Sequence, residues 1–243
     1  MIEPKKAVKN ASSENKYPDI EWRLKLDKNE NVYEASKFVV SALKNFDGEK
    51  IHLYPDYSGI IEKLSIEYNL NQKNILLTND DLEAINLVIN TYLDKDEEII
   101  FLNPDSNKLK LIAETSNGTI LYYDKEKLFE LEKIRNNVTS KTKIFYLSTP
   151  DKVTGQAIQV SSVLRLLEEY PNILFVVDIS YVNFAQNIDI MDFIDLIENY
   201  SNIALIKSFS SDYALAGLGG AVLLSNFENI KNLKILSLPN SVN

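Results

Sequence analysis

The chain alternates short, strongly apolar segments with segments of helical spacing over most of its length. Segments 143–147, 173–177 and 203–206 are rich in β-branched and aromatic residues, as buried strands are. Segments 34–46 and 82–89 instead repeat apolar residues every three or four positions, which is typical of helices. Strands joined by helices form parallel sheets with both faces covered. The pattern therefore predicts an α/β fold with a mostly parallel sheet of about seven strands between helices.

The remaining expected elements follow the same two patterns. Further strands are expected at 74–78, 98–102, 119–123 and 220–224, and further helices at 60–66, 109–113 and 226–236. Residues 1–22 are polar and unpatterned. We therefore expect an N-terminal arm over 1–22, followed by one domain over 23–243.

Charge and residue counts argue against several classes of function. The net charge of −9 disfavours nucleic acid and anionic lipid as partners, because both are negatively charged. The chain has no cysteine and a single histidine, His52, which argues against a metal site and against a histidine-based triad. No apolar run approaches the roughly 18 residues of a membrane span, and the N-terminus lacks the apolar core of a signal peptide. We expect a cytoplasmic protein without a metal.

Polar residues that could form a site follow two of the expected strands. Asp178 comes directly after the run 173–177, where its carboxylate could face a cationic ring nitrogen or simply cap a turn. Ser208, Ser210 and Ser211 follow the next run, at a strand-to-helix junction that suits either an anion or N-capping. Ligands of open parallel sheets bind at the carboxyl ends of the strands. We therefore expect Asp178 and Ser208 in loops at one edge of the sheet.

Five collinear motifs carry a resemblance to a known family. They are Leu26-Asp-Lys-Asn-Glu-Asn31, Tyr54-Pro-Asp56, Asp178-Ile-Ser-Tyr181 followed by Phe184, Ser208-Phe-Ser210 with Leu215-Ala-Gly-Leu218, and Asn240-Ser-Val-Asn243. With these motifs the chain resembles the fold-type I aminotransferases, and histidinol-phosphate aminotransferase in particular. These enzymes depend on pyridoxal phosphate (PLP). The resemblance implies the large, PLP-binding domain of such an enzyme.

The resemblance also implies roles for individual residues. In the family a lysine holds PLP as a Schiff base and moves a proton between the substrate and the cofactor. By the resemblance, Asp178 would pair with the pyridine nitrogen, Tyr181 would bind the phenolate oxygen, and Ser208 would contact the phosphate. Asn79 and Ser210 complete the expected cofactor-binding residues of the same subunit.

A homodimer and a missing domain follow from the same resemblance. Tyr54 would reach the phosphate that is bound by a partner subunit. The small C-terminal domain of the family, which carries the arginine for the substrate carboxylate, is expected to be absent from this chain. Apolar surface around Leu233, Leu236 and Leu238 should then be exposed where that domain would pack.

The chain departs from the family pattern at positions that contact the cofactor. Ser211 stands where the Schiff-base lysine is expected, and a hydroxyl cannot form that bond. Gly219 replaces a phosphate-binding arginine, and Lys152 replaces an asparagine that contacts the cofactor. Asp80 and Asp81 stand in the phosphate loop, where each carboxylate would repel a phosphate by on the order of 1 kcal/mol. Restoring activity would need at least Ser211→Lys and Gly219→Arg together.

The segment Pro104-Asp-Ser106 also lacks the family's aromatic residue that stacks on the ring. We therefore expect a histidinol-phosphate aminotransferase-like pseudoenzyme without transaminase activity. Two alternatives stay open. The first is an active PLP-dependent aminotransferase, either a fragment completed by a missing C-terminal part or an enzyme that uses another lysine, such as Lys207 or Lys152. The second is a binding module for a small anion. A lysine Nζ about one pyridine ring away from Asp178 would favour the active enzyme.

Overall fold

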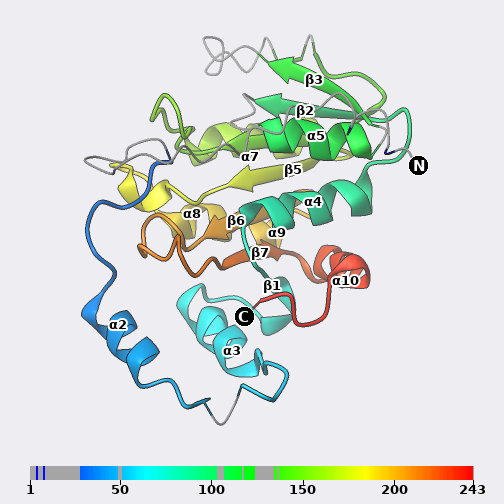
Figure 1. The fold of residues 1–243 in the computed structure, drawn as a ribbon. Coiled ribbons are helices and arrows are strands. Elements are labelled where there is room, and N and C mark those ends of the chain that lie inside the picture. Colours follow the sequence, from blue (N-terminus) through cyan, green and yellow to red (C-terminus); the bar gives the residue numbers. More distant parts are fainter. Residues whose placement is uncertain are drawn as a thin grey trace.

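The computed structural model describes residues 28–48, 51–102, 107–116, 118–123, 134, 135 and 137–242, together with the isolated residues 4 and 8. Its centre is a seven-stranded sheet (Figure 1). The strands are β1 (Ile75–Thr78), β2 (Glu98–Leu102), β3 (Thr119–Tyr123), β4 (Thr142–Ser148), β5 (Leu174–Asp178), β6 (Ile203–Ser208) and β7 (Ala221–Ser225). Each of the strands predicted from the sequence is present, with bounds that differ by at most two residues.

The strand order is β1-β7-β6-β5-β4-β2-β3. Strand β7 is antiparallel to its neighbours β1 and β6, and the other neighbouring pairs are parallel. Every strand except β7 therefore runs in the same direction. The predicted α/β fold with a mostly parallel sheet is confirmed.

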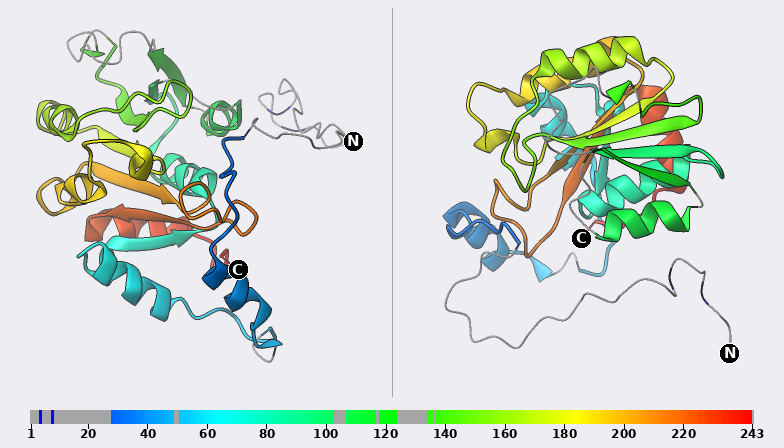
Figure 2. Two further views of the ribbon diagram at one scale, coloured as in Figure 1. Left: turned by 90° about the vertical axis from the view of Figure 1, so that its left-hand side faces the viewer. Right: turned by 90° about the horizontal axis from the view of Figure 1, so that it is seen from above.

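Helices cover both faces of this sheet (Figures 1 and 2). One face packs against α4 (Asp81–Tyr92), α5 (Asn107–Thr115) and α10 (Phe227–Leu236). The other packs against α3 (Ser58–Glu67), α7 (Val160–Glu169), α8 (Ile190–Ile194) and α9 (Leu196–Asn199). Within β5, Phe175 and Val177 join one core while Leu174 and Val176 join the other. The strands are therefore continuous apolar runs, because both of their faces are buried.

Three of these helices were not among the expected ones. The helix α7 does carry a helical signal, because Val163, Leu166 and Leu167 recur at three- and four-residue spacing and are buried. The helices α8 and α9 are five and four residues long, which is too short for apolar periodicity to appear. Among the described residues, no helix is long and apolar enough to serve as a bilayer span.

The expected exposure at the end of the chain is only partly correct. Leu236 and Leu238 are exposed, at 50% and 71%. Leu233 is instead fully buried, because α10 packs against α4 and β7. The end of the described chain also returns to α3. There the hydroxyl of Tyr57 donates a hydrogen bond to the carbonyl oxygen of Val242 at 2.6 Å.

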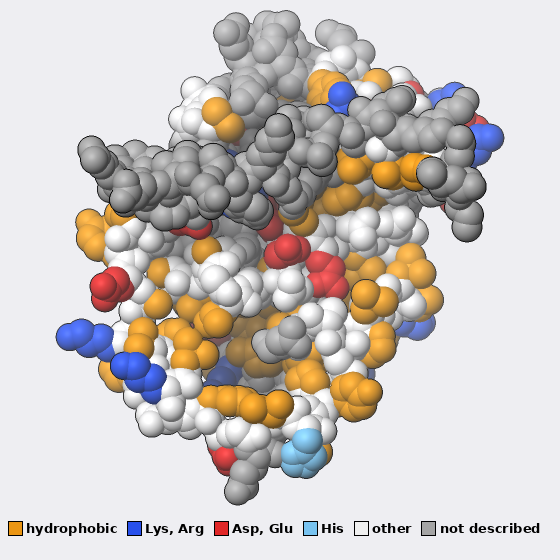
Figure 3. Space-filling view, viewed as in Figure 1, with side chains coloured by type: hydrophobic (Ala, Val, Ile, Leu, Met, Phe, Trp, Pro, Cys, Tyr) orange, Lys and Arg blue, Asp and Glu red, His pale blue; other side chains and the backbone are white. Residues whose placement is uncertain are grey.

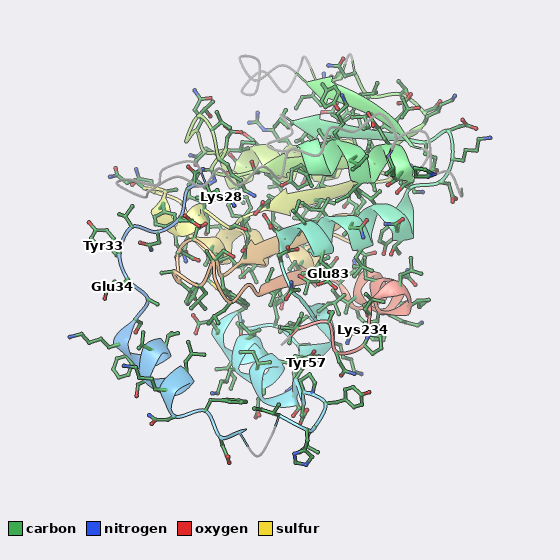
Figure 4. All side chains as sticks on the ribbon, viewed as in Figure 1. Lys28, Tyr33, Glu34, Tyr57, Glu83 and Lys234 are labelled. Atoms are coloured by element: carbon green, nitrogen blue, oxygen red, sulfur yellow. The ribbon has the colours of Figure 1, made fainter. Side chains whose placement is uncertain are left out.

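The helix α2 (Lys37–Lys44) lies apart from the two packed layers (Figure 1). It begins after Ser36, whose hydroxyl caps its first turn, and none of its residues is buried. Figure 4 labels Tyr33 and Glu34 on the segment that leads into it, away from the sheet. The predicted N-terminal arm over 1–22 lies outside the described residues, apart from residues 4 and 8.

Candidate active site at the carboxyl edge of the sheet

Four parallel strands end in polar residues at one edge of the sheet. The final residues of β1, β4, β5 and β6 are Thr78, Ser148, Asp178 and Ser208, and all four are buried. Asp178 and Ser208 therefore share one edge, as predicted, although each is the last residue of a strand and not part of a loop. The carboxyl edge of a parallel sheet is where α/β proteins bind ligands.

Asp178 is a buried carboxylate whose hydrogen-bonding capacity is used within the chain. Its Oδ1 accepts a hydrogen bond from the backbone N–H of Ser180 at 2.9 Å. Its Oδ2 accepts one from the hydroxyl of Tyr146 at 3.2 Å. The Nζ of Lys152 lies 2.8 Å from the same Oδ2. Asp178 thus has the cationic partner that a buried carboxylate requires.

Lys152 reaches Asp178 from the loop that follows β4. Its neighbour Asp151 holds this loop closed, because its carbonyl oxygen accepts a hydrogen bond from the N–H of Gly155 at 2.8 Å. Its Oδ1 also accepts one from the N–H of Thr154 at 2.6 Å. The position of Lys152 is therefore set by a structured turn.

The ammonium group of Lys152 contacts a second carboxylate as well. Its Nζ lies 3.0 Å from Oδ2 of Asp81, the first residue of α4. The Nζ also lies 5.8 Å from the ring centroid of Tyr181, and the side chain of Lys152 is only 18% exposed. One largely buried ammonium therefore joins the carboxylates of Asp81 and Asp178.

These contacts keep both members of the buried pair charged. Burial by itself would lower the pKa of Lys152, but the carboxylate of Asp178 outweighs burial and raises the pKa above its ordinary value of 10.5. Burial by itself would raise the pKa of Asp178, but the ammonium of Lys152 outweighs it and holds the pKa below 3.8. The amine of Lys152 is therefore protonated at neutral pH and is not a nucleophile.

The first turn of α4 is capped by the chain's own carboxylates. The Oδ1 of Asp80 accepts a hydrogen bond from the N–H of Glu83 at 2.7 Å. The Oδ1 of Asp81 accepts one from the N–H of Leu82 at 3.1 Å. The Oε2 of Glu83, labelled in Figure 4, accepts one from the N–H of Asn79 at 2.6 Å. Three N–H groups that could bind an anion at this turn are therefore already used.

Lys207 is placed on the opposite face of the sheet from Asp178. Side chains alternate between faces along a strand, so that Lys207 shares a face with Leu205, which is packed against α3, α7, α8 and α9. Asp178 instead faces the α4 side, where it meets Lys152. The Nζ of Lys207 donates a hydrogen bond to the carbonyl oxygen of Ser180 at 3.1 Å and pairs with Asp212. The ammonium of Lys207 is therefore held on the other face of the sheet by Ser180 and Asp212.

Among the predicted serines, Ser208 ends β6, and Ser210 and Ser211 lie in the turn that follows. The N–H of Ser208 donates to the hydroxyl of Ser180 at 2.9 Å, and the hydroxyl of Ser208 accepts from the N–H of Ser210 at 3.2 Å. The carbonyl oxygen of Ser211 accepts from the side-chain amide of Asn31 at 3.1 Å. Between Ser208 and β7 the described chain forms turns and no helix, so the expected strand-to-helix junction is wrong, and these contacts stabilise a turn instead of capping a helix.

Asn79 and Tyr54 are two further residues that the sequence predicted for the site. Asn79 lies in the turn between β1 and α4, and its carbonyl oxygen accepts a hydrogen bond from the N–H of Gly220 at 2.5 Å. Asn29 donates a hydrogen bond to the carbonyl oxygen of Lys152 at 3.2 Å, which places the N-terminal motif beside the site. Tyr54 is 86% exposed, on the segment between α2 and α3. Residues 26, 27, 104–106 and 243 of the quoted motifs lie outside the described residues.

Three ionic contacts of this region were not predicted from the sequence, and one of them is the pair of Lys152 with Asp178. Asp81 and Lys152 also pair with one another, whereas the sequence predicted only the loss of a cofactor contact at each position. The buried pair of Lys207 and Asp212 was not expected either. No local sequence pattern predicts such contacts, because they depend on which loops the folded sheet brings together.

The fold and its site together define a class of protein. A mostly parallel seven-stranded sheet with a buried aspartate at its carboxyl edge is the arrangement expected for the large domain of fold-type I aminotransferases. The chain belongs to the aminotransferase class I and II family, whose family model matches residues 23–242.

Individual relatives agree with this assignment. A histidinol-phosphate aminotransferase from Methanocaldococcus jannaschii is 32% identical over 202 residues, which cover 80% of this chain and 53% of the relative. Histidinol-phosphate aminotransferase 2 from Oceanobacillus iheyensis is 28% identical over 250 residues, which cover 100% of this chain and 68% of the relative. The chain thus spans about half to two-thirds of the length of these relatives.

Solved structures show the same fold. The histidinol-phosphate aminotransferase from Clostridium acetobutylicum matches with a TM-score of 0.75 and 20% identity, over 88% of this chain and 64% of that chain. The L-threonine-O-3-phosphate decarboxylase from Porphyromonas gingivalis matches with a TM-score of 0.75 and 22% identity, over 88% of this chain and 66% of that chain. These likenesses concern the fold alone.

The residues of the site do not fit PLP as they are arranged. A protonated ring nitrogen needs a carboxylate, and a phosphate needs N–H or cationic donors. The Nζ of Lys152 does approach Asp178, but at 2.8 Å, which is the distance of an ion pair and leaves no room for a ring. Over the described residues, the buried side-chain atom without a hydrogen-bond partner is Oγ of Ser148, an uncharged hydroxyl. Among the described residues at this edge, the charged groups of Asp81, Lys152 and Asp178 are paired with one another.

Proposed function

We propose that this chain is a histidinol-phosphate aminotransferase-like protein that does not catalyse transamination. The observation that carries the proposal is the contact between Nζ of Lys152 and Oδ2 of Asp178, because a cofactor ring would need that space. Ser211, at the position of the family's Schiff-base lysine, supplies no amine. A positioned acid–base group is worth about 10²–10⁴ in rate, and its loss alone would remove most of the catalysis.

The lysines considered as replacements do not support an active enzyme. Lys207 lies on the far face of the sheet and is paired with Asp212. Lys152 is protonated and held between Asp81 and Asp178. Each amine would have to leave its carboxylate partner before it could attack an aldehyde.

Borohydride trapping tests this proposal. The full chain is incubated with PLP, reduced with borohydride and digested, and each lysine is examined by mass spectrometry. We expect no stoichiometric reduced adduct, whereas a histidinol-phosphate aminotransferase relative treated in parallel should give one. A single stoichiometric adduct on this chain would overturn the proposal. The variants Lys152→Ala and Lys207→Ala would then identify the reacting amine.

We further propose that the chain forms a homodimer through α2 and the segment that follows it. An isolated helix of eight residues is not stable in water, so a helix without buried residues needs another surface. Apolar side chains gather on this part of the molecule (Figure 3). Phe38 is 88% exposed and Leu43 54%, and Tyr54, expected to reach a partner subunit, is 86% exposed.

A further inference from the structure

We infer that Asp81 and Lys152 replace, within the protein, the two charges that a bound PLP molecule would supply. The inference rests on the proposed absence of transaminase activity and extends it to the cofactor site itself. PLP would bring a positive charge on its ring nitrogen and a negative charge on its phosphate. Lys152 brings a positive charge and Asp81 a negative charge to the same edge of the sheet.

The positive charge is needed at Asp178. This residue is 1% exposed, and a buried carboxylate without a cation is strongly unfavourable. Its hydrogen bonds from Ser180 and Tyr146 come from neutral groups and leave its negative charge unbalanced. The ammonium of Lys152, 2.8 Å away, provides the balance.

The negative charge is needed at the start of α4. The first N–H groups of a helix have no partner within the helix, and their dipoles favour an anion. The carboxylates of Asp80 and Asp81 accept the hydrogen bonds of Glu83 and Leu82. No external anion is required there.

Asp81 joins the two ends of the site. Its Oδ1 accepts a hydrogen bond from the first turn of α4, and its Oδ2 lies 3.0 Å from Nζ of Lys152. Contacts therefore run without a gap from the helix through Asp81 and Lys152 to Asp178. Because Lys152 lies between the two carboxylates, their mutual repulsion is offset. Removing the Asp81–Lys152 pair should leave Asp178 without a cation and α4 with fewer acceptors.

The double variant Asp81→Ser/Lys152→Asn tests the inference, because it removes both charges and leaves small polar side chains in their place. Binding of PLP to the 243-residue chain is measured by equilibrium dialysis, and melting temperatures are recorded with and without about 1 mM PLP. We expect PLP to leave the melting temperature of the wild type unchanged. The double variant should melt several degrees lower, recover part of that loss with PLP, and bind PLP at least about tenfold more tightly than the wild type.

A matched control uses the exposed pair Glu228–Lys231 on α10, whose Lys231 Nζ lies 3.3 Å from Glu228 Oε2. The variant Glu228→Ser/Lys231→Asn makes the same chemical changes away from the site, and it should behave as the wild type. Inorganic phosphate and pyridoxine, each lacking one of the two parts of PLP, should stabilise the double variant less than PLP does. Equal PLP binding by the wild type and the double variant would overturn the inference.

A second measurement on the wild type does not depend on the variant's folding. Reductive methylation is followed by mass spectrometry, and we expect Lys152 to react at least about tenfold more slowly than the exposed Lys231. Equal rates would show that the buried pair does not form, and would also overturn the inference. Failure of the inference differs from failure of the proposed function. Non-covalent PLP binding by the wild type contradicts only the inference. A stoichiometric reduced adduct contradicts the proposed lack of transaminase activity.

Discussion

The carbonyl oxygen of Asn79 lies 2.8 Å from the point that a Cβ atom on Gly219 would occupy. Gly219 also has a φ of +73°, which residues with a side chain rarely adopt. The turn between β1 and α4 therefore lies so close to position 219 that only a residue without a side chain fits there. An arginine at position 219 requires this turn to move, so Ser211→Lys with Gly219→Arg is not sufficient to rebuild a phosphate site.

The first prediction concerns this close approach. Gly219→Ala and Gly219→Arg should each lower the free energy of unfolding by about 1–3 kcal/mol, through backbone strain and overlap with Asn79. Urea unfolding measures the change. Gly155 is the control, because its φ is +70° but a Cβ there would meet nothing within 4 Å. Gly155→Ala should therefore cost less, and equal losses at both positions would contradict the steric role of Asn79.

The second prediction concerns the buried ion pair. Lys152→Met and Asp178→Asn should each lower the free energy of unfolding by about 3–5 kcal/mol, because each leaves a buried partner unbalanced. The double variant should lose clearly less than the two single losses together. A double-mutant cycle in urea measures this coupling. The exposed Lys231→Met should change stability by no more than about 0.5 kcal/mol, and strict additivity at the buried pair would show that the two residues do not interact.

The third prediction concerns pH. The folded pKa of Asp178 is held below 3.8, so its stabilising effect is present above 3.8 and is lost as the pH falls through the folded value. The folded pKa of Lys152 is raised above 10.5, so its effect is present below 10.5 and is lost only as the pH rises beyond that value. Urea unfolding of the wild type should therefore show a loss of stability below pH 3.8 that Asp178→Asn shows less steeply. Parallel acid profiles for the two proteins would contradict this assignment.

The fourth prediction concerns assembly. Sedimentation should show a homodimer, and Phe38→Glu should raise its dissociation constant at least about tenfold, because the charge would be buried in the interface. Lys37→Glu introduces the same charge one residue earlier, on a side chain that is already polar, and should have a smaller effect. A wild type that sediments as a monomer at all accessible concentrations would contradict the proposed dimer.

Much of the fold could be predicted from local patterns. Apolar runs such as 173–177 predicted strands because burial on both faces leaves no place for polar residues. The helices α8 and α9 were missed because five and four residues contain too few turns for a periodic signal. The burial of Leu233 was also missed, because it depends on α4, which lies far from it in the sequence.

The sequence by itself determined which residues stand at the ends of the strands and that position 211 carries no amine. Only the tertiary structure decided what these residues contact. Asp81 and Lys152 follow β1 and β4, and Asp178 ends β5; the three meet because the sheet brings the ends of these strands to one edge. The alternation along β6 likewise decided that Lys207 faces away from Asp178. Ionic contacts between distant segments depend on strand order and strand face, and these are properties of the assembled sheet rather than of any local stretch of sequence.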